Sequence, residues 1–205
     1  MAEQRVLITG ASGQLGTAFH AILPNAIVPE RAALDLNEVD DIVRFVRATS
    51  PDLIINCAAW TAVDAAEGSE AAARAINARA VAVLAQESEA SSARFVTFST
   101  DYVFSGEASR PYVESDVPSP RSAYGRSKLE GERAAIEYNP SAIVVRTAWL
   151  VSGTHENFVS TVLRKVSAGA PMRVVDDQVG SPSSVDDVAR RVLSIERSGE
   201  TGLFH

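Results

Sequence analysis

Sulfur and imidazole side chains are scarce in this sequence. Its 205 residues include one cysteine, Cys57, and three histidines. A lone cysteine excludes an internal disulfide, and three scattered histidines form no recognisable metal-ligand cluster, so we expect no metal site. Cys57 lies in an apolar run and is predicted to be a small core residue. Such sparing use of cysteine is consistent with a reducing cytoplasm.

Long apolar runs and an excess of positive charge are also missing. No stretch is long enough to span a membrane, and the N-terminal Met-Ala-Glu-Gln-Arg lacks the apolar region of a signal peptide. The formal net charge is −7, with no cluster of Lys and Arg, which argues against a nucleic-acid-binding surface. We therefore expect a cytoplasmic enzyme that binds neither membranes nor nucleic acids.

What the sequence does contain is a regular alternation of short apolar runs with helical patterns. The apolar runs lie at residues 5–9, 26–28, 53–55, 95–98 and 142–145. The helical patterns lie at residues 15–23, 38–48, 69–90 and 122–137. This order predicts a Rossmann-type α/β fold, a doubly wound parallel sheet with helices on both faces.

After Trp149 the alternation loosens. A helix is expected at 156–167, a strand at 173–175 and a helix at 185–195. We predict one Rossmann domain over residues 1–150, and the glycine-rich turn at Gly10–Gly16 within it predicts NAD(P) binding. Residues 151–205 are predicted to form a small, incomplete substrate lobe packed on that same domain.

A glycine-rich turn follows the first apolar run. Strand, glycine turn and helix in this order form the context that a dinucleotide-binding fingerprint requires. The glycines let the backbone approach a pyrophosphate, and the helix N-terminus offers free N–H groups and a positive dipole. A plain strand-to-helix turn is the alternative, but the position at the start of an α/β chain favours a cofactor site. The expected cofactor-binding residues of this loop are Gly10, Ser12, Gly13, Gln14, Leu15 and Gly16.

Tyr124 and Lys128 are four residues apart on a predicted helix, so their side chains share one face. A phenol has a reference pKa near ~10, and a neighbouring ammonium lowers that pKa towards working pH. Such a pair can pass a proton to or from a substrate oxygen. The pair alone is common on helices, as a half-buried tyrosine beside a solvated lysine. The glycine loop upstream favours the catalytic interpretation.

Polar residues end three of the predicted strands, where ligands of such sheets bind. Ser99 and Thr100 end the run at 95–98, and a hydroxyl there can meet the Tyr124 phenol over one carbonyl oxygen. Since neighbouring strand residues point to opposite faces, we expect one of the two to reach it, and periodicity does not say which. Capping of the next turn is the alternative role.

Together these motifs resemble the extended short-chain dehydrogenase/reductase superfamily and, within it, the dTDP-4-dehydrorhamnose reductase family. The resemblance runs from Arg5 to His205. The segments that carry it are Gly10–Gly16, Asn56–Asp64, Ser99–Phe104, Tyr124–Glu132, Arg146–Trp149 and Val174–Pro182.

This resemblance implies NAD(P)H-dependent reduction of the C4 keto group of a dTDP-4-keto-6-deoxy sugar, from dTDP-4-dehydrorhamnose to dTDP-rhamnose. It implies that Thr100, Tyr124 and Lys128 are catalytic, with Tyr124 and Lys128 also at the cofactor. Thr100, Asp101 and Trp149 are then expected near the nucleotide sugar. Further residues implied to line the cofactor are Asp35, Leu36, Ala58, Ala59 and Trp60.

Two features depart from that pattern or qualify it. Family members continue past Gly202–His205, so we expect weaker substrate binding here, or a homodimer in which the partner completes the site. After the second apolar run, Glu30 favours NADH by accepting from a ribose 2′-hydroxyl, whereas Arg31 favours NADPH by pairing with a 2′-phosphate. Arg31 can equally be a solvated loop charge. We expect both cofactors to bind, with a preference for NADPH.

Two other functions stay open. Nucleotide-sugar dehydratases of this superfamily usually carry an Asp-Glu pair after the Ser/Thr, whereas Thr100-Asp101-Tyr102 lacks the second carboxylate, which favours plain reduction over dehydration or epimerisation. A non-catalytic NADP-binding regulatory subunit is the other alternative. An intact Thr100, Tyr124 and Lys128 set argues against it, because a binding subunit has no need of proton transfer.

Overall fold

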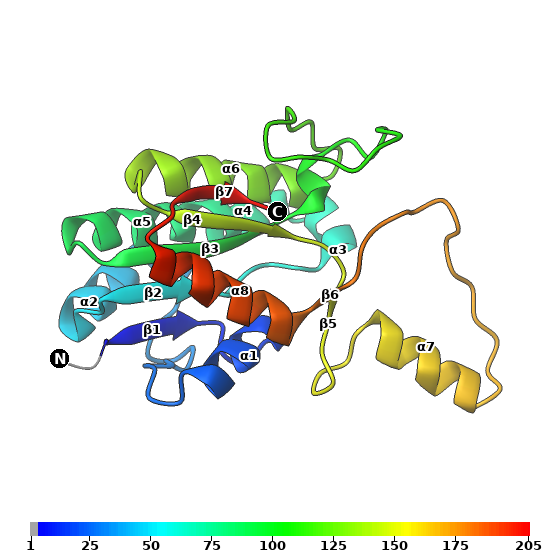
Figure 1. Cartoon of the computed structure of the whole chain (residues 1–205), viewed down its shortest axis with the longest axis horizontal. Helices are drawn as coiled ribbons and strands as arrows, with labels where there is room; N and C mark the ends of the chain where they lie inside the picture. The colour runs from blue at the N-terminus through cyan, green and yellow to red at the C-terminus, as the bar shows by residue number, and fades with distance from the viewer. Residues whose placement is uncertain (1–3) are drawn as a thin grey trace.

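A five-stranded parallel sheet forms the centre of the computed structural model, which describes residues 4–205 (Figure 1). The first three residues of the predicted first domain lie outside the described residues. All neighbouring strands pair in parallel, in the order β1-β2-β3-β4-β7. The strands are β1 (Val6–Thr9), β2 (Leu53–Asn56), β3 (Arg94–Thr100), β4 (Ile143–Thr147) and β7 (Gly202–Phe204). The predicted Rossmann-type α/β fold is confirmed.

The strand predicted at 26–28 is reduced to a single bridge, so that prediction is wrong in extent. Ile27 alone pairs with β1, through Ile8 N to Ile27 O at 2.9 Å and Ile27 N to Val6 O at 2.7 Å. Pro29 follows directly and, lacking an N–H, cannot extend the pairing. Ile27 lies on the opposite side of β1 from β2. The direction in which the chain adds strands therefore reverses between β1 and β2, which creates a topological switch point.

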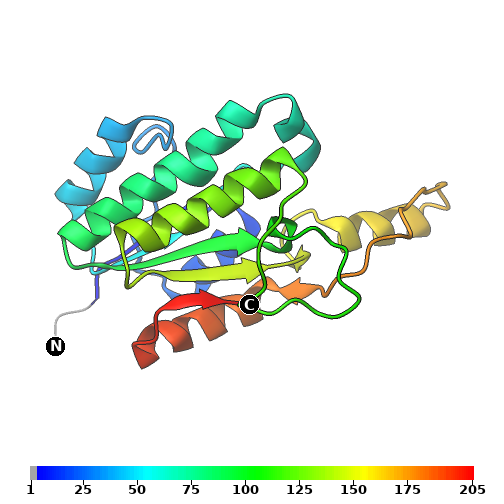
Figure 2. The same cartoon turned by 90° about the horizontal axis from the view of Figure 1, so that it is seen from above.

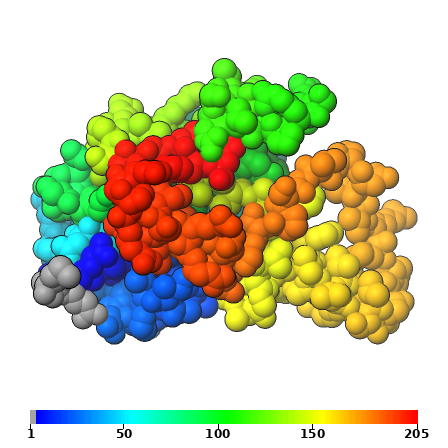
Figure 3. All heavy atoms as spheres, in the orientation of Figure 1, coloured from blue at the N-terminus to red at the C-terminus, as the bar shows by residue number. Residues whose placement is uncertain are grey.

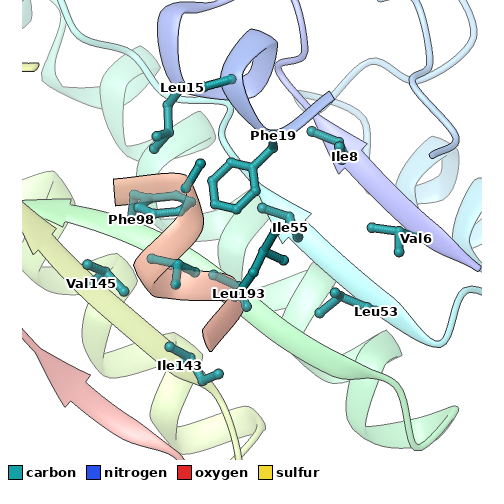
Figure 4. Packing of buried hydrophobic residues seen from close by; sticks show 14 of the residues in the cluster. Val6, Ile8, Leu15, Phe19, Leu53, Ile55, Phe98, Ile143, Val145 and Leu193 are labelled. Carbon is teal, nitrogen blue, oxygen red and sulfur yellow. The ribbon is translucent and has the colours of Figure 1, made fainter. Parts of the chain in front are cut away.

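Helices cover both faces of the sheet (Figure 2). The first face carries α1 (Gln14–Ile22) and α8 (Val185–Ser198), and the second carries α2 (Val39–Thr49), α5 (Ala80–Ala90) and α6 (Ala123–Tyr138). Strand alternation divides the core accordingly, since Val6 and Ile8 join the first cluster and Leu7 the second. On the first face Phe19 packs against Phe98 with ring centroids 5.7 Å apart (Figure 4).

The helix predicted at 69–90 is continuous but not uniform. It runs through α4 (Glu70–Arg74), a π-helical turn (Ala75–Arg79) and α5. A π turn inserts one extra residue into an α-helix and is often found at functional sites. Here it brings Asn77 to Gly131 of α6, where any side chain on the glycine would strike the Asn77 carbonyl oxygen. Two further short elements are the helix α3 (Val63–Glu67) and the 3₁₀ turn Asp101–Val103.

Beyond β4 the chain leaves the sheet and returns to it. The strands β5 (Leu150–Val151) and β6 (Ser183–Ser184) pair in parallel and close a projecting segment, residues 152–182, which we call the arm. The arm carries α7 (Phe158–Ser167), in which no residue is buried (Figure 3). The strand predicted at 173–175 is wrong, because these residues run exposed along the arm without a strand partner.

After β6 the chain rejoins the main sheet through α8 and β7. Val185, Ala189, Val192 and Leu193 of α8 enter the first core cluster, and β7 pairs with β4. The division into domains 1–150 and 151–205 stays a prediction. Among residues 4–205, no helix combines the length and the apolar character needed to cross a bilayer.

Candidate active site

The polar loops that follow β1, β2, β3 and β4 gather at one edge of the sheet (Figure 1). Gly10 stands where the ends of β1 and β2 come closest, at the switch point. Its φ is +66°, and a Cβ there would lie 2.6 Å from Ala58 N. Only glycine fits both the left-handed conformation and that spacing. The local structure therefore requires Gly10, and it places Ala58 beside the glycine loop.

The rest of the glycine loop divides into residues that face out and residues that pack. Ser12 and Gly13 are exposed, and Gly13 caps α1 without any side-chain bond to the helix N–H groups. A Cβ at Gly13 would make only an ordinary 3.4 Å contact with Gly10 O. The side chain of Leu15 is instead in the core, and a Cβ at Gly16 would strike Gly10 O.

An exposed, uncapped helix N-terminus beside a backbone that leaves no room for a Cβ fits a dinucleotide pyrophosphate. Ser12, Gly13 and the first N–H groups of α1 face outward and can hold it. Leu15 can contribute only its backbone, and Gly16 serves the packing of the turn.

The loop after Ile27 carries the predicted ribose and adenine residues. Glu30 and Arg31 are exposed, so their side chains are free to meet a ligand. Asp35 is turned towards its own loop, where Oδ1 accepts from Asn37 N at 2.9 Å and Asn37 Nδ2 at 2.8 Å. These bonds hold the pKa of Asp35 below its ordinary value. Leu36 packs against the second core cluster.

Tyr124 and Lys128 lie in the first turns of α6, as their spacing predicted. The helix begins at Ser122, whose Oγ accepts from Gly125 N at 3.0 Å. Tyr124 is 9% exposed and Lys128 6%. The Tyr124 ring meets the edge of Tyr102 with centroids 5.6 Å apart. Both functional groups are therefore held in place by packing from several sides.

The pKa of Tyr124 differs from the sequence expectation. Burial raises it to about 12, and the neighbouring Thr100 hydroxyl opposes this rise. Lys128 was expected to lower the pKa of Tyr124, and that expectation is wrong: the pKa is raised, and Lys128 is not among the groups that shift it. Burial also lowers the pKa of Lys128 to about 8, with the negative charge of Glu132 opposing. The Lys128 side chain therefore changes between its charged and neutral forms near its pKa of about 8.

The structure separates Ser99 from Thr100. Thr100 lies near enough to Tyr124 to lower the pKa of that phenol, and it also caps the following turn, with Oγ1 accepting from Tyr102 N at 3.2 Å. Ser99 points the other way, and its buried Oγ has no partner within residues 4–205. Thr100 is thus positioned for both roles considered for this pair, whereas Ser99 is positioned for neither.

The predicted substrate residues are Asp101, which follows Thr100 directly, and Trp149, which lies just beyond β4. Burial raises the pKa of Asp101, whose Oδ1 accepts from Thr100 Oγ1 at 3.1 Å. Trp149 lies between β4 and β5, with φ at +45°, and is 43% exposed. A left-handed tryptophan is strained, and such strain persists only where the surroundings impose it. Gly180 provides those surroundings, since a Cβ there would lie 2.8 Å from the Trp149 ring.

Sequence patterns missed Asn77, which connects two parts of the site. Its Oδ1 accepts from Trp60 N at 2.9 Å, and its Nδ2 donates to Trp60 O at 3.0 Å and to Ser127 Oγ at 2.9 Å. Asn77 therefore ties the loop after β2 to the helix that carries Tyr124 and Lys128. A lone asparagine in an alanine-rich helix was the available signal.

A buried ion pair behind Lys128 was missed as well. Glu132 and Arg146 are each 5% exposed at the side chain and form a two-point contact at 2.8 and 2.7 Å. Arg146 also lies 4.8 Å from the centre of the Phe104 ring and 3.2 Å from His205 Nε2. The pair locks α6 to β4 beneath the site. In the described part of the chain, no three His, Cys, Asp or Glu side chains cluster as metal ligands would.

Comparison with known proteins places this geometry in context. Residues 4–205 match the family described as RmlD substrate binding domain. A dTDP-4-dehydrorhamnose reductase of Burkholderia thailandensis is 39% identical over 98% of this chain and 70% of its own length.

Two solved dTDP-4-dehydrorhamnose reductases superpose closely. That of Clostridium acetobutylicum is 41% identical with a TM-score of 0.94, covering 98% of this chain and 73% of the other. That of Bacillus anthracis, solved in complex with NADP, is 35% identical with a TM-score of 0.95, covering 100% and 74%.

Proposed function

This chain belongs to the RmlD substrate binding domain family, and from that premise we infer that it is an NAD(P)H-dependent sugar-nucleotide reductase. It reduces the C4 keto group of a dTDP-4-keto-6-deoxy sugar, converting dTDP-4-dehydrorhamnose to dTDP-rhamnose. The observation that carries this function is the Thr100–Tyr124 contact beside Lys128, at the same sheet edge as the glycine loop.

The cofactor supplies a hydride for the carbonyl carbon when it is bound. Ser12, Gly13 and the α1 N-terminus would hold its pyrophosphate. Ala58, Ala59 and Trp60 would line it, with Asn77 fixing the Trp60 backbone. Glu30 and Arg31 are free to contact its ribose, and Arg31 adds the preference for NADPH through a charge-assisted pair with a 2′-phosphate.

The proton for the carbonyl oxygen comes from the Tyr124 hydroxyl. A phenol whose pKa is near 12 is protonated at neutral pH, so Tyr124 carries the proton to be donated, and its raised pKa makes it a weaker acid than a free phenol. Thr100 hydrogen-bonds the same oxygen and stabilises the charge that develops on it. The Lys128 ammonium stabilises the phenolate that Tyr124 leaves behind. Fixing hydride donor, ketone and acid together supplies much of the rate acceleration.

Reduction fits these residues better than dehydration. Elimination needs a second carboxylate after Thr100-Asp101, and Tyr102 stands there with its ring against Tyr124. Asp101 and Trp149 are assigned to the sugar nucleotide, on the side of the site that the arm borders.

Three finer points belong to the same proposal. Residues 1–150 are the cofactor domain, and residues 151–205 contribute the substrate lobe. The enzyme works in the cytoplasm, which its sparing use of cysteine supports. A homodimer is part of the proposal, and a rise of specific activity with protein concentration would support it.

Turnover separates this proposal from its alternative. NADPH oxidation is measured with a dTDP-4-keto-6-deoxy sugar at several enzyme concentrations, and the reduced sugar is identified by mass spectrometry. We expect NADPH oxidation that depends on the keto sugar and yields the reduced sugar. Tight NADPH binding without turnover at any enzyme concentration would replace the reductase by a non-catalytic NADP-binding subunit.

A further inference from the structure

The arm meets the body at a second place besides the β5–β6 pairing. Its first residues lie against the glycine loop. Ser152 Oγ donates to Gln14 Oε1 at 3.0 Å, and His155 Nε2 lies 3.0 Å from the Ser12 carbonyl oxygen. These contacts join positions 138 and 143 residues apart in the sequence. We call Ser152, His155 and Asn157 the latch.

The chemistry of these contacts defines the His155 tautomer. A carbonyl oxygen only accepts, so Nε2 must carry the hydrogen that reaches Ser12. Nδ1 lies 3.0 Å from Thr154 Oγ1 and accepts from that hydroxyl, and His155 N donates to Ser152 Oγ at 3.2 Å. The ring is held at both nitrogens, and Ser152 connects it to Gln14.

Asn157, the third residue of the latch, connects the other two residues to α7. Its Oδ1 accepts from Ser160 N at 3.1 Å and Asn157 N donates to Ser160 Oγ at 2.8 Å, which together cap the helix. Its Nδ2 donates to Ser152 O at 2.8 Å and His155 O at 3.0 Å, and lies 3.5 Å from Gln14 Oε1. Asn157 therefore both caps α7 and holds the preceding turn beside the glycine loop.

The arm depends on such attachments because α7 has no core of its own. Phe158, Leu163 and Val166 are 64%, 62% and 66% exposed. A helix without buried contacts opens at low free-energy cost, so its order follows that of its attachment points. One attachment is the β5–β6 neck, where Gly180 also lies against Trp149, and another is the glycine loop.

We propose that Ser152, His155 and Asn157 are positioning residues that couple cofactor binding to the order of the arm. Dinucleotide binding immobilises Ser12 and Gln14, the latch then persists, and α7 is held where the sugar nucleotide is to bind. Such coupling is reciprocal. If cofactor binding favours the ordered arm by a given factor, loss of the latch lowers the affinity for the cofactor by that same factor. The proposal rests on the proposed function, since it takes the glycine loop as the pyrophosphate site.

Hydrogen exchange followed by mass spectrometry tests the coupling with NADPH alone. In the wild-type chain, NADPH should slow exchange both in the glycine loop, residues 10–16, and in α7, residues 158–167. In the double variant Ser152→Ala, His155→Phe, NADPH should slow exchange in the glycine loop only. Its Kd for NADPH should rise about three- to tenfold, the loss expected for one or two solvent-accessible hydrogen bonds.

Two further variants separate a positioning role from a general structural one. His155→Gln puts an amide N–H near the place of Nε2, so it should restore both NADPH affinity and the α7 response. Glu156→Gln is the matched control, because Glu156 pairs with Arg164 on the arm and not with the glycine loop. That variant should respond to NADPH like the wild type.

The outcomes are distinct. If NADPH protects residues 10–16 of the wild type but leaves α7 unchanged, the latch proposal is wrong and the proposed function stands. If α7 is still protected in the double variant, the coupling runs through other residues and the proposal is again wrong. If the wild type binds no NADPH, the proposed function fails and the latch fails with it.

Discussion

The body of the molecule, which is the main sheet with the helices packed on it, differs from the arm in how its residues are held in place. Tyr124, Lys128 and the Glu132–Arg146 pair are nearly inaccessible to solvent, and each is fixed by a sheet or a helix on several sides. Residues 152–182 bury none of α7 and depend on their attachments to the body. Chemistry that needs sub-ångström placement is thus built on packed elements, whereas the arm is suited to adjust to a ligand. The predictions below test that contrast.

The largest effect is expected from Tyr124→Phe. The change removes only the acid, so cofactor binding should persist while hydride transfer falls about a hundredfold or more. Single-turnover measurement of NADPH oxidation reports the loss. Leu163→Ser, an exposed position on α7, should leave the rate at saturating substrate unchanged. Near wild-type transfer in Tyr124→Phe would mean that the proton comes from another group.

The second prediction concerns pH and has opposite signs for activity and stability. Lys128 has a pKa near 8 in the folded chain against an ordinary value of 10.5, because burial disfavours its charge. The ammonium is present below pH 8 and is lost as pH rises through that value. Reduction should therefore fall towards about tenfold per pH unit above pH 8, if the charge is essential.

Stability should change in the other direction over the same range. Between about pH 8 and 10 the unfolded chain binds more protons at Lys128 than the folded chain does, so the free energy of unfolding rises. The gain should be on the order of 1 to 3 kcal/mol. Urea titrations of the wild type and Lys128→Met measure it, and the methionine variant should lose both trends. Equal trends in the two chains would assign them to another group.

Third, two glycine substitutions compare packing in the body and the arm directly. Gly131→Ala would drive a methyl group into the Asn77 carbonyl and should lower the free energy of unfolding by about 2 kcal/mol. Gly153→Ala meets nothing within 4 Å and should change it by less than about 0.5 kcal/mol. Chemical denaturation gives both values. Equal costs would contradict the difference in packing.

The smallest effect is expected at Arg31, which is in the body but as exposed as an arm residue. Arg31→Ala should weaken NADPH more than NADH by about 1 kcal/mol, because only the 2′-phosphate loses its partner. Since the side chain is solvated, added salt should reduce the difference. Calorimetric titration with both cofactors measures it. Equal losses would make Arg31 a general loop residue.

Local patterns predicted the body well because its elements are specified by their own residues. The apolar run at 95–98 and the helix at 122–137 match β3 and α6. The runs at 26–28 and 173–175 look similar in sequence, but one makes a single bridge and the other has no partner. A short apolar run becomes a strand only when a neighbouring strand is available for pairing.

The sequence predicted individual residues of the candidate site but not the contacts that join them. Alternation placed Ser99 and Thr100 on opposite faces, and the family resemblance singled out Thr100. The structure then showed which hydroxyl faces Tyr124. Asn77, the Glu132–Arg146 pair and the latch join different elements of the fold, and the local sequence around each residue does not specify its partner.

The two-residue ladder between β5 and β6 has a consequence for how the chain tolerates change. It brings Val151 and Ser183 close together. The residues between them therefore form a closed loop whose two ends lie side by side. The entropy of closing such a loop grows only logarithmically, and doubling its length costs about 0.6 kcal/mol. The arm can therefore gain or lose residues over evolution while β4, α8 and β7 keep their register. Substrate range can diverge there at little expense to folding.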